Sequence, residues 1–161
     1  MVRLIATGGT FDKHYDELRG HLTFGTSHLA AALQRARVTL QVVLEQLPLM
    51  DSLDMQDVDR QRILDASRRS TETSIVIVHG TDTMVETAEL LDAAALSKTI
   101  VLTGAMIPYE IANSDALFNL GFACGIAQSL PAGVYVAMNG QYFEANRVHK
   151  NRQKGIFEAV P

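Results

Sequence analysis

Two short segments of the chain run from apolar, β-branched residues into glycine and then into hydroxyl residues. The first covers residues 5–10 (IATGGT) and the second covers residues 78–83 (VHGTDT). An open α/β sheet presents reactive groups in this way, in the loops that follow the carboxyl ends of its parallel strands. The two segments therefore predict a parallel sheet in which loops far apart in the sequence meet at one edge.

The rest of the chain supports this prediction, because apolar runs alternate with helical periodicity. Strands are predicted over residues 2–6, 38–44, 75–78, 100–102 and 134–137. Helices are predicted over residues 29–36, 57–69, 84–95 and 117–127. Several of the strands are apolar throughout, as in sheets that are buried on both sides. The pattern predicts an α/β fold, a single domain with an open, mostly parallel sheet and helices on both faces.

Composition narrows the class of protein. The chain has 161 residues, 47% of them hydrophobic, and a formal net charge of −4, which favours neither nucleic acid nor an anionic membrane as a partner. No apolar run reaches the ~18 residues of a membrane-spanning helix, and no secretory leader precedes the first strand, so we expect a cytoplasmic protein. Cys124 is the only cysteine, which excludes an intrachain disulfide, and we expect it to be a buried thiol.

The predicted strand ends carry residues suited to hydroxyl-based catalysis on a small substrate. Glycine lets the backbone approach a ligand and point its N–H groups at an oxyanion. A threonine beyond the glycine pair can attack a carbonyl carbon if another group accepts its proton. A nucleotide-binding domain is an alternative interpretation, but the sequence contains neither the Walker pattern nor the G-x-G-x-x-G pattern.

Other polar residues receive structural interpretations. Thr83 and Glu86 have the spacing of a capping box at the start of a helix. His79, at a buried strand end, is predicted to be a hydrogen-bonded structural histidine. The remaining histidines of the N-terminal region, His14, His21 and His28, lack compact metal-ligand spacing and are expected at the surface rather than in a zinc site.

In this arrangement the chain resembles the bacterial-type L-asparaginase/glutaminase family of amidohydrolases. The matching segments, in the order of the family, are residues 6–10 (ATGGT), 51–55 (DSLDM), 78–88 (VHGTDTMVETA), 102–108 (LTGAMIP), 114–115 (SD), 118–120 (FNL) and 147–150 (RVHK). They span nearly the whole chain. The resemblance implies hydrolysis of L-asparagine to L-aspartate and ammonia, with neither a metal nor an organic cofactor.

The resemblance also implies catalytic roles. Thr10 matches a threonine nucleophile that forms an acyl-enzyme, and Thr81, Asp82 and Lys150 match a cluster that assists proton transfer. Tyr15 is our choice for the family's catalytic tyrosine, with a plain lid residue as the alternative. From the residues alone, the favoured interpretation of Lys150 is one charge of a solvated basic face; the resemblance favours the catalytic role instead.

The resemblance further implies a set of substrate-binding positions. These are Gly9, Ser52, Gly80, Thr81, Asp82 and Ala105. Asp82 suits the α-ammonium group of an amino acid, because a carboxylate taken out of water needs a cation. Asparagine, glutamine and related amides remain open as substrates.

One expected departure from the family concerns its second, smaller C-terminal domain, which we expect this protein to lack. In the family, that region of a neighbouring protomer lends a carboxylate to the site. The candidates for a replacement here are Glu110, Glu144 and Glu158. We therefore expect self-association, as a homodimer or homotetramer. The alternative function is a catalytically weak domain that binds an amino acid, as a sensor or as the partner of another chain.

Overall fold

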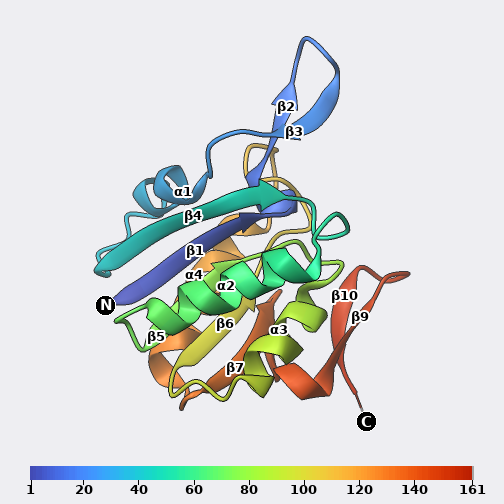
Figure 1. Cartoon of the computed structure of the whole chain (residues 1–161). Coiled ribbons are helices and arrows are strands. Elements are labelled where there is room, and N and C mark those ends of the chain that lie inside the picture. The colour runs from blue at the N-terminus through green and yellow to red at the C-terminus, as the bar shows by residue number, and fades with distance from the viewer. Residues whose placement is uncertain (161) are drawn as a thin grey trace.

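A six-stranded sheet forms the centre of the computed structural model, which describes residues 1–160 (Figure 1). Its strands, in spatial order, are β4 (Val42–Met50), β1 (Val2–Gly8), β5 (Ser74–Val78), β6 (Thr99–Thr103), β7 (Gly133–Met138) and β8 (Gln141–Glu144). The first five are parallel, and β8 returns antiparallel to β7. The predicted α/β fold with an open, mostly parallel sheet is confirmed.

Helices cover both faces of the sheet, also as predicted. The helices are α1 (Leu29–Arg35), α2 (Asp57–Arg69), α3 (Met84–Ala93) and α4 (Ala116–Ser129). On β5, Val76 and Val78 join the core beneath α1 and α4, whereas Ile75 and Ile77 join the core beneath α2 and α3. Because strand side chains alternate between faces, an entirely apolar strand can fill two cores at once. Cys124 is buried in the first core, as expected, and burial raises its pKa to about 11.

The largest boundary difference concerns β4. We expected this strand at residues 38–44, and it lies at Val42–Met50. It includes Glu45 and Pro48, which lie beyond the predicted end of the strand. The strand lies at the edge of the sheet, however, where a proline is tolerated, and the Glu45 carboxylate forms an ion pair of 2.8 Å with Arg3 of the neighbouring β1.

Two hairpins lie outside the main sheet. Strands β2 (Lys13–Asp16) and β3 (His21–Phe24) pair antiparallel and extend away from the body of the molecule (Figure 1). No strand was predicted over residues 13–24, and both strands of this hairpin contain polar residues. Strands β9 (Val148–Asn151) and β10 (Ile156–Ala159) form the second hairpin. From the C-terminal segment, Val148 and Phe157 complete the core under α3.

The predicted capping box of Thr83 and Glu86 is wrong. The side chain of Thr83 makes no cap hydrogen bond, and Glu86 instead accepts a hydrogen bond of 2.7 Å from Arg60. A capping box forms at the preceding helix, α2, between Gln56 and Asp59. No helix in the described part of the chain is long and apolar enough to cross a membrane.

Candidate functional site

The loops that follow β1, β4 and β5 pack against one another backbone to backbone. Gly9 has a φ of 72°, and a Cβ placed on it would lie 2.4 Å from the backbone of Gly80. A Cβ on Gly80 would in turn lie 2.6 Å from the side chain of Ser52. Only glycine fits at such approaches. The two segments that the sequence singled out are therefore brought into contact.

Lys150 reaches this edge from the β9–β10 hairpin. Its Nζ donates hydrogen bonds of 2.7 Å to both Thr81 Oγ1 and Asp82 Oδ1. The lysine side chain is only 10% exposed, which excludes the alternative of a solvated basic face. Arg152 adds a weaker contact, 3.3 Å to the backbone oxygen of Asp82. The structure thus unites Thr81, Asp82 and Lys150 into one hydrogen-bonded cluster.

Buried hydrogen bonds hold the backbone around this cluster. Thr83 Oγ1 donates to the carbonyl oxygen of Ser52 at 2.8 Å, and the Thr83 N–H donates to Ser52 Oγ at 3.3 Å. Thr83 therefore ties the loop after β5 to the loop after β4. This contact explains why its hydroxyl is not used as a helix cap.

His79 is the structural histidine that the sequence predicted. It is fully buried, with Nδ1 at 2.7 Å from the Gly80 carbonyl oxygen and Nε2 at 2.9 Å from Thr87 Oγ1. Burial, together with the nearby charge of Arg60, lowers the pKa of His79 to about 4. The neutral ring donates through Nδ1 and accepts through Nε2, which fixes the carbonyl of Gly80.

Thr10 and Tyr15 lie in a different environment. Thr10 opens a short 3-10 helix, η1 (Thr10–Asp12), directly after Gly9, and within residues 1–160 its hydroxyl makes no hydrogen bond. Tyr15 lies on β2 of the protruding hairpin and is 62% exposed. The hydroxyl of Thr10 is thus free to meet a substrate, while Tyr15 is not packed against the Lys150 cluster.

A pair from the hairpin base borders the same edge. Lys13 Nζ donates to Asp51 Oδ2 at 2.7 Å. Burial alone would raise the pKa of Asp51, but the hydrogen bonds from Lys13 and from the Leu53 N–H, with the charges of Lys13 and Lys150, hold it below its ordinary value. Asp51 therefore remains ionised beside Ser52. This pair was not predicted, because nothing in the sequence spacing of Lys13 and Asp51 indicates that they are in contact.

Ala105 is buried in the loop after β6, and a carboxylate orders that loop. Asp115 accepts hydrogen bonds from the backbone N–H groups of Met106 and Ile107, each at 3.0 Å. Asn119 donates to the Gly104 carbonyl at 3.0 Å and to Asp115 at 2.9 Å. Asp115 and Asn119, at the start of α4, therefore hold the loop after β6 in place. This positioning role was not predicted from the sequence.

The three candidate carboxylates all lie in pairs of their own. Glu144 contacts Arg147 at 3.4 Å, and Glu158 accepts from Asn151 and Lys154. Glu110 lies 3.0 Å from His14 Nδ1. None of these contacts reaches Thr10. The expectation that the N-terminal histidines lie at the surface is wrong for His28, which is buried.

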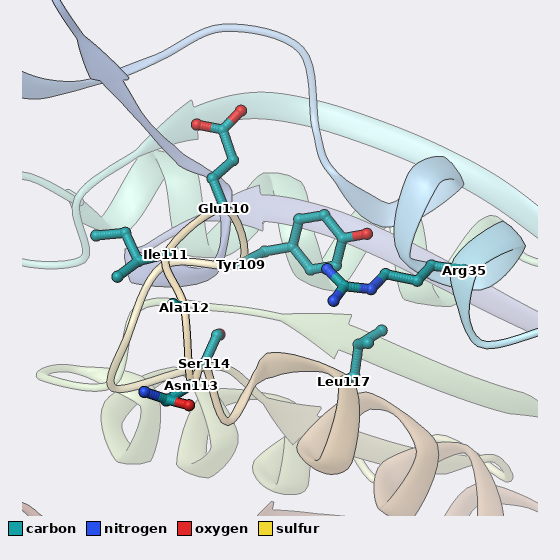
Figure 2. A pocket seen from close by; sticks show the side chains of 8 residues that line it. All are labelled: Arg35, Tyr109, Glu110, Ile111, Ala112, Asn113, Ser114 and Leu117. Carbon is teal, nitrogen blue, oxygen red and sulfur yellow. The ribbon is translucent and has the colours of Figure 1, made fainter.

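A cavity of about 390 Å³ lies beside the site rather than in it (Figure 2). Its lining residues are Arg35, Tyr109, Glu110, Ile111, Ala112, Asn113, Ser114 and Leu117. The cavity opens between α1, the loop after β6 and α4. The threonines and Lys150 lie instead on the open edge of the sheet, where Asp82 keeps 34% of its side chain exposed.

Fold and site together define an α/β protein with two hydroxyl-bearing loops and a buried lysine at the carboxyl edge of a parallel sheet. The family described as "Asparaginase, N-terminal" matches residues 1–158, so the chain belongs to the asparaginase family. It is 32% identical over 160 residues to L-asparaginase 1 of Escherichia coli K12, covering 93% of this chain and 47% of that protein.

Two further relatives mark the breadth of the family. The thermostable L-asparaginase of Thermococcus kodakarensis superposes with a TM-score of 0.88 at 28% identity, over 99% of this chain and 51% of that one. A probable periplasmic L-asparaginase of Haemophilus influenzae is 31% identical over 176 residues, 96% of this chain and 47% of that protein. The chain thus spans about half the length of the asparaginases it matches.

Proposed function

We propose that this chain is an amidohydrolase that converts L-asparagine to L-aspartate and ammonia through an acyl-enzyme on Thr10. The observation that carries the proposal is the Lys150 cluster, in which the Nζ of one largely buried lysine contacts Thr81 and Asp82 at 2.7 Å each. A site that only binds a ligand does not require a lysine hydrogen-bonded to a threonine hydroxyl. A catalytic site that passes protons along a chain of donors and acceptors does require such a contact.

In the proposed reaction the Thr10 hydroxyl oxygen attacks the carbon of the side-chain amide. The hydroxyl proton passes to the departing nitrogen, which leaves as ammonia, and an ester remains on Thr10. Water then attacks the ester, releasing aspartate and returning a proton to Thr10. We assign the relay of protons and the activation of this water to Lys150 and Thr81.

The same edge offers groups for the substrate. Asp82 suits the α-ammonium group, and Ser52, whose Oγ already accepts the Thr83 N–H, keeps a proton to donate to the α-carboxylate. The backbones of Gly9, Gly80 and Ala105 are proposed to cradle the amide and its developing oxyanion. Tyr15 is proposed to approach Thr10 when substrate is bound.

Self-association is part of the proposal. The site lies on an open edge, and no carboxylate of the described chain touches Thr10. A second copy of this chain in a homodimer or homotetramer is proposed to cover it. L-asparagine is proposed over L-glutamine from the resemblance alone.

Ammonia release from L-asparagine, with L-glutamine in parallel, tests the proposal. The purified protein is compared with its Thr10→Ala variant and with Thr73→Ala, which changes an exposed threonine at the opposite end of β5. We expect activity that Thr10→Ala abolishes and Thr73→Ala preserves. A wild-type protein without activity, whose thermal stability rises with aspartate, would instead establish the alternative of an amino-acid-binding domain.

A further inference from the structure

Three metal-ligating side chains from distant parts of the sequence meet at the base of the β2–β3 hairpin. His14 lies on β2, His28 precedes α1, and Glu110 lies in the loop after β6. One ligand atom from each residue lies within 4.8 Å of those of the other two. Figure 2 shows the carboxylate of Glu110 pointing away from Arg35 and Leu117, toward the hairpin.

The hydrogen bonds of His14 determine which ring nitrogen carries its proton. His14 Nε2 lies 2.9 Å from the carbonyl oxygen of Thr26, which can only accept, so Nε2 is a donor. In the neutral ring, Nδ1 then bears a lone pair, and this lone pair faces Oε1 of Glu110 at 3.0 Å. Two lone pairs at this distance need a positive charge between them.

His28 brings a third ligand atom, its Nε2, to the same point. Its side chain is more than nine-tenths buried, and within residues 1–160 its Nε2 has no hydrogen-bond partner. Oε1 of Glu110 lies 3.7 Å from this Nε2. A proton on His14 would satisfy one of the two contacts with Glu110 and leave His28 without a partner.

We propose that His14, His28 and Glu110 bind a divalent transition-metal ion, with zinc as the reference ion. Two imidazoles and one carboxylate form a donor set that zinc and its neighbours accept. In a tetrahedral site with bonds of about 2.0–2.1 Å, ligand atoms lie about 3.3 Å apart. The distances of 3.0 and 3.7 Å around Glu110 Oε1 bracket that value.

The surroundings have the features of a metal site's outer shell. A ligating histidine commonly donates its second ring N–H to a backbone carbonyl, as His14 does to Thr26. His28 is held by its backbone N–H, which donates to Asp12 Oδ1 at 2.8 Å. Glu110 keeps 42% of its side chain exposed, which leaves a path from solvent.

The ion would join three segments that the main sheet does not connect. It would tie β2 to the start of α1 and to the loop after β6, and thereby orient the hairpin that carries Tyr15. The proposal does not depend on the proposed amidohydrolase function, since it concerns the position of the hairpin and not the chemistry at Thr10.

Metal binding by the untagged chain, stripped with chelator, tests the proposal directly. Zinc is titrated in competition with a chromogenic chelator, and Co²⁺ is titrated while its visible absorption is recorded. We compare the wild type with His14→Ala and Glu110→Gln, and with His21→Ala as the matched control. His21 is an exposed histidine on the other strand of the same hairpin.

We expect one ion per chain, and tetrahedral Co²⁺ bands that both ligand variants lose. Zinc affinity should fall by about 10–100-fold or more in His14→Ala and Glu110→Gln, since even outer-shell changes have effects of that size. The His21→Ala variant should bind as the wild type does. The proposal is overturned if the wild type binds zinc no more tightly than His14→Ala, or if His21→Ala weakens binding equally. Far-ultraviolet circular dichroism confirms that each variant is folded.

Discussion

The family resemblance assigns catalytic roles to two groups of residues, and these groups differ in their burial and in their contacts with the central sheet. Thr81 is buried, and the Lys150 side chain, only 10% exposed, donates hydrogen bonds to Thr81 and to Asp82. Tyr15 lies on a hairpin outside that sheet with 62% of its surface exposed. One half of the proposed site is therefore complete within a single chain. The other half depends on where the hairpin lies and on what covers it.

The difference has a physical origin. The loops after β1, β4 and β5 are in close backbone contact, so the residues around Lys150 have a single arrangement. Closely packed protein interiors tolerate little displacement of their atoms. The hairpin is fixed to the body mainly at its base, through Lys13 with Asp51 and through His14 with Glu110. We accordingly expect substitutions in the first half to have larger effects than substitutions in the second.

Replacing Lys150 should have the largest effect on activity. Lys150→Met keeps the length of the side chain but removes the proton donor to Thr81, and turnover should fall by about 10²–10⁴-fold, the usual contribution of a general acid or base. Lys154→Met, which changes an exposed lysine of the same hairpin, should retain full activity. Steady-state ammonia release measures both. Equal rates for Lys150→Met and the wild type would remove Lys150 from the mechanism.

Crowding the contact between the glycine loops should have the next largest effect, on stability. Gly9→Ala combines a φ of 72° with a Cβ at 2.4 Å from the backbone of Gly80, so we expect a loss of about 2–4 kcal/mol. Gly121→Ala is the control, since Gly121 lies within α4 with open space around its Cβ position. That change should stabilise the protein by about 0.5–1 kcal/mol. Urea denaturation gives both values, and an unchanged midpoint for Gly9→Ala would show that the loops are not tightly packed.

The buried half should also carry a distinct pH dependence of stability through His79. Its folded pKa of about 4 lies below the ordinary 6.5, so between these values the unfolded chain binds more protons. Stability is therefore full above pH 6.5 and declines as the pH falls toward 4, by roughly 3 kcal/mol at about 1.36 kcal/mol per pKa unit. In His79→Gln this decline should be much smaller, whereas His21→Gln should behave as the wild type. Identical slopes for His79→Gln and the wild type would contradict the assignment.

Tyr15→Phe should give the smallest of these effects. Loss of the phenolic hydroxyl is expected to lower kcat by about 10-fold, less than the usual 10²–10⁴-fold contribution of a general acid or base, because the hairpin is less firmly held than the sheet edge. Tyr142→Phe, which changes an exposed tyrosine on β8, is the control. If both variants match the wild type, Tyr15 is a lid residue only.

Features carried by local pattern were predictable from the sequence. Strands β1, β5, β6 and β7 are apolar on both faces, and α2 was predicted at the residues where it lies. Edge strand β4 was displaced and β3 was missed, since both contain polar residues that reach water. Local pattern also predicted the wrong hydrogen bond for the Thr83 side chain. The spacing to Glu86 indicates a possible helix cap, but it does not show that the hydroxyl donates instead to the carbonyl of Ser52.

The candidate site divides in the same way. The glycine and hydroxyl segments were visible, because each lies directly after a strand. The contact of Lys150 with Thr81 required the family resemblance, since a lysine among basic residues carries no signal of burial. The meeting of His14, His28 and Glu110 was invisible, because it depends on how the hairpin, α1 and the loop after β6 fold together.

The central claim is that Thr10, rather than the lysine-linked Thr81, carries the acyl group. The most direct measurement is peptide mass spectrometry of the protein quenched in acid during turnover of L-asparagine. An aspartyl ester on the peptide that contains Thr10, absent from the Thr10→Ala variant, is the predicted result. An ester on the peptide that contains Thr81 would contradict it, and would identify Thr81, in the Lys150 half of the site, as the nucleophile.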